Sequence, residues 1–179
     1  IGKWHLTLAS EYASGESKAR WPLSRGFERY YGFLGGKTSQ WAPTLVSDNH
    51  YIDPPNALDE SYHLNADLAD RAIEFVTDLR TVAPEKPFFL YYCLGAGHSP
   101  HHVEREWIEK YEGQFDKGWD TWREEVYARQ LASGIIPPGT QLSPRPEWVP
   151  AWDSLSADEQ RLYARQMEVY AAFLEQTDH

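Results

Sequence analysis

The sequence is poor in cysteine, in basic residues and in long apolar runs. Its single cysteine, Cys93, excludes a disulfide framework. None of its apolar runs approaches the roughly 18 residues that a membrane-spanning helix needs, so we expect no membrane span. Lys and Arg number 17 against 27 Asp and Glu, a net charge of −10, whereas nucleic-acid-binding proteins usually present a basic face. These shortages disfavour nucleic acid as a partner and leave small-molecule chemistry open.

Aromatic and apolar residues are plentiful, at 15% and 41% of 179 residues. A chain of this length buries about 70% of its unfolded surface, so the composition predicts one folded domain with a hydrophobic core. The first residue is Ile1 rather than Met, and a C-terminal helix is predicted to run to His179 without a terminating Gly or Pro. We therefore expect residues 1–179 to be an interior segment of a longer protein, truncated at both ends.

The order of predicted elements in the N-terminal part indicates an α/β fold. Residues 1–60 are interrupted by Gly and Pro, which predicts loops and short elements near a functional face. Asn65 is predicted to cap a helix that ends before Pro84. The continuous apolar run 88–94 predicts a strand buried on both faces. The apolar stripe of the helix consists of Leu64, Leu68, Ala72, Ile73, Val76 and Leu79.

The C-terminal part is predicted to be helical. Amphipathic helices are expected over 103–111 and 119–132, the second ended by Gly134, and an extended connector over 135–152. Ser156 and Glu159 form a capping-box signal for the last helix. Its predicted core-facing stripe consists of Tyr163, Met167, Tyr170, Ala171 and Leu174, and Trp148 and Trp152 of the connector are expected to pack onto the body.

The first candidate for chemistry is the pair Lys3 and His5. Two residues separated by one position on an extended segment point to the same side, so the pair could present an ammonium and an imidazole to one anionic group. From spacing alone, a strand end with two solvated polar residues is the commoner alternative.

The second candidate is His98, in the loop after the predicted strand. Ligands of open α/β sheets bind beyond the carboxyl ends of the strands, which places His98 well for catalysis. A zinc site built with His101 and His102 is disfavoured, because Pro100 prevents a regular helical face and no Cys or carboxylate lies at ligand spacing. The glycines of this loop could hold a phosphate or sulfate, but a tight turn is the commoner reason for them.

Other candidates have simpler explanations. The adjacent pair Asp48 and Asn49 is typical of a surface turn rather than of a cation site. Cys93 lies inside the apolar run and is expected to be a small buried hydrophobe. Trp41 could stack on a sugar or an aryl group, although core packing is the commoner use of tryptophan.

An ordered series of motifs resembles the sulfatase family, and bacterial arylsulfatases most closely. Residues 2–6, Gly-Lys-Trp-His-Leu, match the second signature of that family, and residues 25–36 are similar to the segment that follows it. The resemblance covers essentially the whole chain. It continues through 62–64, the following helix to Phe75, 86–90, 98–100, 115–120, 168–171 and 178–179.

The resemblance implies an alkaline-phosphatase-like α/β fold and roles for three residues. Lys3 corresponds to the lysine that binds the sulfate and the formylglycine nucleophile. His5 corresponds to the histidine that contacts the formylglycine hydroxyls and helps to eliminate sulfate. His98 corresponds to the histidine that hydrogen-bonds the sulfate and aids the leaving group. These roles suit the chemistry, because sulfate-ester cleavage needs cations around developing negative charge and a proton at the bridging oxygen.

Two parts of the family pattern are missing. The chain contains no Cys-x-Pro-x-Arg motif or its Ser version, from which formylglycine is made. It also lacks the acidic pair near the family's N-terminus and the later Asp-Asn pair, which together hold Ca²⁺ or Mg²⁺ in the family. The pair Asp48 and Asn49 precedes His98, whereas the family's metal pair follows the equivalent histidine. No residue of this chain is therefore assigned as a metal ligand, and we expect the segment to be inactive in isolation.

The resemblance implies that the parent protein hydrolyses a small-molecule sulfate ester, with an aryl sulfate favoured. It also implies a bacterial enzyme of the cytoplasm or periplasm, without deciding the compartment or the oligomeric state. One alternative is a phosphomonoester, phosphodiester or phosphonate hydrolase of the same superfamily. The other is a non-catalytic homologue that binds a sugar or a partner through its aromatic surface.

Overall fold

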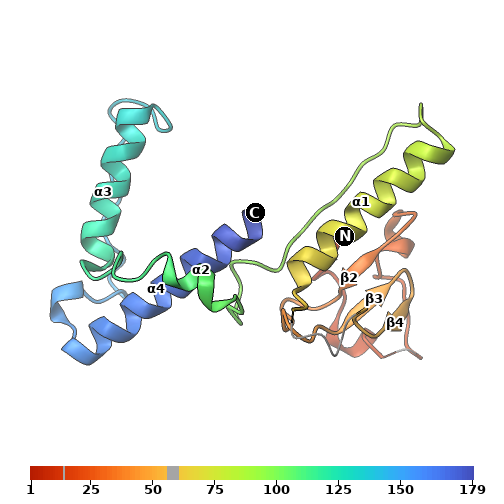
Figure 1. Cartoon of the computed structure of the whole chain (residues 1–179), viewed down its shortest axis with the longest axis horizontal. Helices are drawn as coiled ribbons and strands as arrows, with labels where there is room; N and C mark the ends of the chain where they lie inside the picture. Colours follow the sequence, from red (N-terminus) through yellow and green to blue (C-terminus); the bar gives the residue numbers. More distant parts are fainter. Residues whose placement is uncertain (14, 56–60) are drawn as a thin grey trace. The chain divides into compact units, whose positions relative to one another are not determined.

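The computed structural model describes residues 1–13, 15–55 and 61–179, in two compact units, 1–102 and 103–179 (Figure 1). The short elements expected over 1–60 are present there, although residues 14 and 56–60 lie outside the described ranges. The first unit combines a mixed sheet with one long helix, and the second unit is helical. This content is consistent with the predicted α/β class. None of the helices in the described ranges is long and apolar enough to cross a membrane.

The first unit is built on a four-stranded sheet in the order β1-β2-β3-β4. The strands are β1 (Gly2–Lys3), β2 (Tyr31–Phe33), β3 (Leu45–Ser47) and β4 (His50–Ile52). β1 pairs parallel with β2, while the other two pairs are antiparallel. Strands of two or three residues are too short to show an alternating pattern, so the sequence predicted short elements here but not their pairing.

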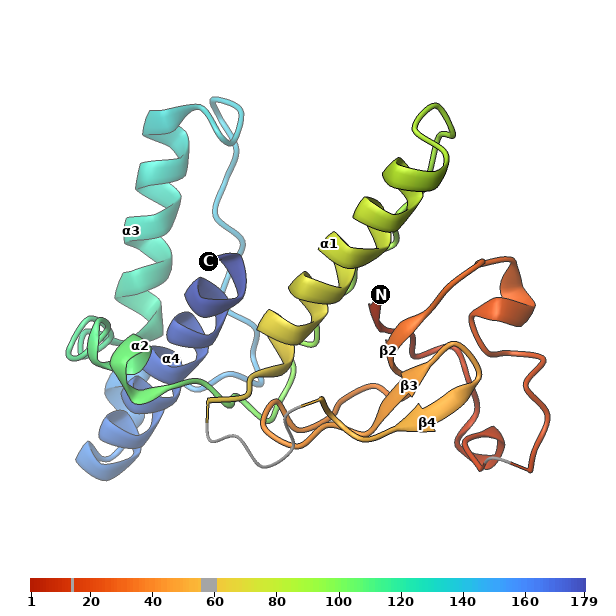
Figure 2. The same ribbon diagram turned by 45° about the vertical axis from the view of Figure 1, so that its right-hand side comes forward.

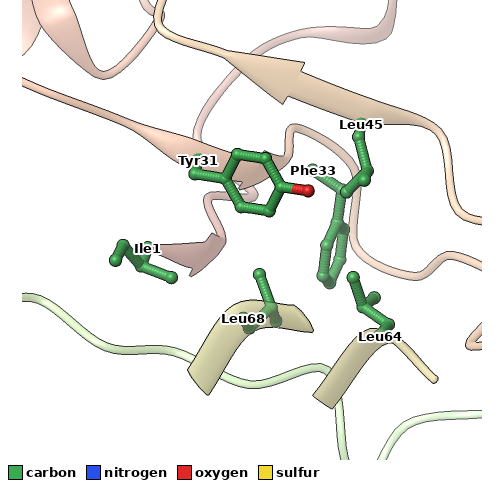
Figure 3. Packing of buried hydrophobic residues seen from close by; sticks show 6 residues of the cluster. All are labelled: Ile1, Tyr31, Phe33, Leu45, Leu64 and Leu68. Atoms are coloured by element: carbon green, nitrogen blue, oxygen red, sulfur yellow. The ribbon is translucent and has the colours of Figure 1, made fainter. Parts of the chain in front are cut away.

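The sheet carries a hydrophobic cluster on each face, because successive side chains of a strand point to opposite sides. On one face, the helix α1 (Leu64–Val82) contributes Leu64 and Leu68, which point toward the sheet in Figure 3. That cluster contains Ile1, Tyr31, Phe33, Leu45, Leu64 and Leu68. The opposite cluster contains Trp4, Trp21, Tyr30, Leu34 and Val46, so residues from the first 34 positions cover the second face.

Two details of the α1 prediction were wrong. The cap is His63, whose side chain accepts a hydrogen bond from the backbone N–H of Asn65, rather than Asn65 itself. Ile73 of the predicted stripe is 65% exposed. A helix of 19 residues is roughly 28 Å long, whereas a three-residue strand spans about 10 Å, so only the first turns of α1 can pack on the sheet.

The run 88–94 is not the doubly buried strand that the sequence predicted. Its only strand-like pairing in the described chain is a parallel bridge between Cys93 and Gly2. Residues 88–92 are between 38% and 78% exposed, and Cys93 itself is only half-buried. The predicted burial is therefore wrong for residues 88–92, and the described chain supplies a hydrogen-bonding neighbour on one side alone, namely residues 1–3.

The second unit contains α2 (Arg105–Glu109), α3 (Gly118–Ser133) and α4 (Ala157–Asp178), and α2 packs against α4 (Figure 2). The predicted capping box of Ser156 and Glu159 and the Gly134 terminator are both confirmed. Trp152 is buried as predicted, whereas Trp148 is 84% exposed. Short 3₁₀ helices complete the chain: η1 (Ala9–Glu11), η2 (Leu23–Arg25) and η3 (Trp152–Ser154).

The predicted stripe of α4 is confirmed in part. Tyr163, Met167 and Ala171 pack against the buried cluster of Phe115, Trp152 and Ala164. Tyr170 and Leu174 are instead 40% and 41% exposed. The buried carboxylate of Glu168 accepts a hydrogen bond from the backbone N–H of Gly113, at 2.8 Å. The buried face thus includes a charged residue, which a stripe drawn through apolar positions could not include.

Candidate active site

Three chain segments run in the same direction and end at one edge of the sheet. β1 is parallel to β2, and residues 91–93 are parallel to β1 on its other side. The backbone N–H of Lys3 donates to the carbonyl of Cys93 at 2.6 Å, and that of Cys93 donates to Ile1 at 3.0 Å. Because parallel segments share the edge at which their carboxyl ends lie, His5 and His98 leave the sheet on the same side.

This arrangement depends on two glycines that allow the backbones to approach closely. A Cβ atom on Gly2 would lie 1.9 Å from the carbonyl oxygen of Cys93. A Cβ atom on Gly32 would lie 2.0 Å from the carbonyl oxygen of Gly2. Both contacts are far below any van der Waals distance, so a side chain at either position would separate β1 from its neighbours. The glycine that precedes Lys3 therefore fixes where Lys3 lies.

Lys3 is half-buried at the end of β1. Within the ranges that the structure describes, Lys3 forms no ion pair. The buried hydroxyl of Tyr30 donates to the carbonyl of Gly2 at 2.9 Å. Burial raises the pKa of Tyr30 well above its ordinary value, so this hydroxyl remains a neutral donor. The ammonium of Lys3 is thus a positive charge on a fixed backbone without a carboxylate partner in the described chain.

His5 does not continue the extended backbone of Lys3, as the sequence argument assumed. Its φ angle is +53°, in the left-handed region, so the alternation of side chains along a strand does not apply to it. The chain turns here because Trp4 and His5 donate backbone hydrogen bonds to Phe33 and Leu34, both at 3.0 Å. The imidazole is exposed and lies against the backbone of Gly36.

His98 is also exposed, and its loop is a tight turn, as predicted. The backbone N–H of His98 donates to the carbonyl of Gly95 at 3.3 Å, and Gly97 has a φ angle of +89°. Nδ1 of His98 lies 2.7 Å from the carbonyl oxygen of Ser99. A carbonyl oxygen only accepts hydrogen bonds, so Nδ1 carries a proton and Nε2 is the nitrogen that remains for a ligand.

Two further histidines hold the end of this loop in place. Nδ1 of His102 accepts from the backbone N–H of Gln40 at 3.4 Å, and His63 donates from Nε2 to the carbonyl of His102 at 3.0 Å. Burial and the neighbouring His63 lower the pKa of His102, which keeps it a neutral acceptor. Sequence reasoning considered His102 only as a metal ligand and gave His63 no role, although the motif 62–64 was a signal for it.

The remaining candidates have structural roles. Asp48 and Asn49 form the two-residue turn between β3 and β4, and the Asp48 carboxylate accepts from the backbone N–H of Tyr30 at 2.9 Å. Trp41 stacks on His102 at 5.8 Å between ring centroids. Among residues 1–13, 15–55 and 61–179, no group of three or more His, Cys, Asp or Glu side chains could hold a metal ion.

Neither of the groups that the family resemblance implies fits the residues present. The described chain lacks a cluster of oxygen ligands for Ca²⁺ or Mg²⁺. Cys93 is followed by Leu94 and Gly95 instead of the sequence from which formylglycine is made. Lys3, His5 and His98 therefore remain the candidate residues, and their side chains are of the kinds that can bind an anion or transfer a proton.

A mixed four-stranded sheet accompanied by helices is consistent with an α/β protein. The family model for sulfatases matches residues 1–179, and the chain belongs to the sulfatase family. It is 30% identical to an uncharacterized sulfatase of Schizosaccharomyces pombe and 28% identical to an arylsulfatase of Klebsiella aerogenes. Each alignment covers 99% of this chain, but 32% and 37% of the respective relative.

A mammalian relative matches over a shorter stretch. The chain is 24% identical to an N-acetylgalactosamine-6-sulfatase of Canis lupus familiaris over 120 residues, which cover 60% of this chain and 21% of the relative. The chain spans about a third of the length of the first two relatives.

Proposed function

We propose that the protein carrying this chain hydrolyses small-molecule sulfate esters, with aryl sulfates as the favoured class. The supporting observations are that the sulfatase family model matches residues 1–179 and that β1, which carries Lys3 and precedes His5, runs parallel to the segment that precedes His98. Both units are proposed to belong to one catalytic domain with an alkaline-phosphatase-like fold. The formylglycine nucleophile and the Ca²⁺ or Mg²⁺ ion are proposed to come from residues outside 1–179, so the isolated segment is expected to be inactive.

Lys3 is proposed to bind the sulfate. Its ammonium has no carboxylate partner in the described chain, and its backbone is held by β2 and by Cys93. Negative charge develops on the bridging oxygen when the ester is cleaved. A fixed positive charge beside the sulfate group stabilises that transition state. His5 is proposed to contact the nucleophile on the same side and to help in eliminating sulfate.

His98 is proposed to protonate the leaving group. When the bond between sulfur and the bridging oxygen breaks, that oxygen takes the bonding electron pair and needs a proton. The imidazolium of His98 supplies it from Nε2, because Nδ1 holds its own proton toward the carbonyl of Ser99. The product of this step is neutral His98 with the proton on Nδ1, the tautomer that the loop already favours.

The test compares sulfate and phosphate esters of 4-nitrophenol in the full-length protein, with and without Lys3→Ala. We expect sulfate to be the better substrate and Lys3→Ala to lower its kcat/KM by about 10²-fold, the loss typical of removing one electrostatic stabiliser. Lys3→Arg keeps the charge and should retain more activity than Lys3→Ala.

Three outcomes would contradict the proposal. Preferred turnover of the phosphate ester would favour a phosphohydrolase of the same superfamily. The absence of turnover with either ester, together with glycan binding, would favour a non-catalytic protein. Equal turnover by Lys3→Ala and the unmodified protein would remove Lys3 from the site.

A further inference from the structure

The imidazole of His5 occupies the space in which a side chain at position 36 would begin. A Cβ atom on Gly36 would lie 2.8 Å from Nε2 of His5, 2.9 Å from Cε1 and 3.3 Å from Cδ2. Real Cβ atoms essentially never approach another heavy atom within 3.0 Å. The ring and a side chain at position 36 therefore exclude each other, and His5 can lie where it does because residue 36 is glycine.

The backbones that carry the two residues are fixed relative to each other. His5 donates its backbone N–H to the carbonyl of Leu34, and Trp4 donates to Phe33. Gly36 follows Leu34 by two residues, so neither backbone can move away without breaking the hydrogen bonds next to β1 and β2. The flexible part of this contact is the His5 side chain, which is exposed.

We propose that Gly36 is a positioning residue for the catalytic histidine His5, an inference that rests on the role given to His5 in the proposed function. Gly36 sets the surface against which the imidazole lies and so limits the directions in which Nε2 can point. A methyl group at position 36 would push the ring aside. Because the ring can move into solvent, the change would appear in the position of the imidazole rather than in the stability of the fold.

The neighbouring glycine offers a matched control. A Cβ atom on Gly35 would lie 3.6 Å from the carbonyl oxygen of Lys37 and 3.7 Å from the hydroxyl of Tyr12, which are ordinary contact distances. Neither Gly35 nor Gly36 has a φ angle in the left-handed region, so alanine suits the backbone at both positions. Gly35→Ala and Gly36→Ala therefore make the same chemical change, but only the second displaces His5.

The experiment uses the full-length protein with 4-nitrophenyl sulfate, and compares Gly36→Ala, Gly35→Ala, His5→Ala and the double variant of Gly36→Ala with His5→Ala. We expect Gly36→Ala to lower kcat by about tenfold to 10²-fold, the loss typical of a reacting group moved by about 1 Å, with KM and Tm little changed. Gly35→Ala should retain the unmodified kcat. The double variant should have the same kcat as His5→Ala alone, because the ring that Gly36→Ala displaces is absent.

A readout independent of turnover is the NMR signal of the His5 ring, assigned by its loss in His5→Ala. Gly36→Ala should shift that signal and Gly35→Ala should not. The inference on Gly36 alone would be overturned if His5→Ala lowered kcat while Gly36→Ala matched Gly35→Ala, or if Gly36→Ala had the same effect with and without His5. Full activity of His5→Ala would overturn the catalytic role of His5 and, with it, the positioning role of Gly36.

Discussion

Replacing His98 with alanine in the full-length protein is expected to lower kcat by about 10²- to 10⁴-fold, the range typical of losing a general acid. The reason is the proposed proton transfer from Nε2 to the bridging oxygen. The size of the loss depends on the leaving group, because the more basic phenolate needs the proton more than 4-nitrophenolate does. The loss of kcat should therefore be larger for phenyl sulfate than for 4-nitrophenyl sulfate. The test measures kcat for both substrates with the unmodified protein and with His98→Ala.

The fold should tolerate this change. The His98 side chain is exposed, and its ring nitrogen Nδ1 lies within hydrogen-bonding distance of its own neighbour, Ser99. Tm should stay within a few degrees of the unmodified value. His50→Ala is a suitable control, because His50 is also exposed but lies on β4, at the far side of the sheet. If His98→Ala lowered kcat by the same factor for every leaving group, proton donation by His98 would be contradicted.

The helices could be predicted from the sequence because their signals are local. The capping box at Ser156, the glycine at position 134 and the spacing of Leu64 and Leu68 each depend on residues within a turn or two. The buried faces were predicted less well. Which side of α4 is covered depends on its packing partners, and Glu168 is buried there although it is charged.

The pairing of the strands in the sheet could not be predicted from local sequence signals. β1 has two residues, and its neighbours β2 and Cys93 are about 30 and 90 positions away along the chain. A strand of two residues is too short to show the alternation of apolar and polar residues by which strands are predicted. The run 88–94 shows the converse, because its apolar character predicted burial while its exposure depends on which segments lie beside it.

The candidate residues stay a prediction from the sequence, and their local geometry could not be predicted from it. Lys3, His5 and His98 were proposed from motif order, and the structure shows that β1 and the segment before His98 run parallel. The left-handed backbone of His5 could not be foreseen, because it results from hydrogen bonds to Phe33 and Leu34. The support of the His98 loop by His63 was missed because the two residues are 35 positions apart in the sequence.

Gly32→Ala is expected to be strongly destabilising, because the added methyl group would overlap the backbone of β1. Its Cβ atom would lie 2.0 Å, 2.6 Å and 2.7 Å from the carbonyl oxygen, the nitrogen and the carbonyl carbon of Gly2. These are backbone atoms, so no side-chain rotation can relieve the clash, and β1 must separate from β2. We expect the free energy of unfolding to fall by about 3 kcal/mol, the upper end of the usual cost of overpacking.

The same change should also abolish activity under conditions in which the protein remains folded, because Lys3 is held in place through the pairing of Gly2 with Gly32. Urea denaturation and kcat/KM of the full-length protein measure the two effects separately. Gly15→Ala is the control, since a Cβ atom there meets no described atom within 4 Å and should leave both quantities unchanged. If Gly32→Ala were as stable as Gly15→Ala, the close approach of β1 and β2 would be wrong, and with it the position of Lys3 at the edge of the sheet.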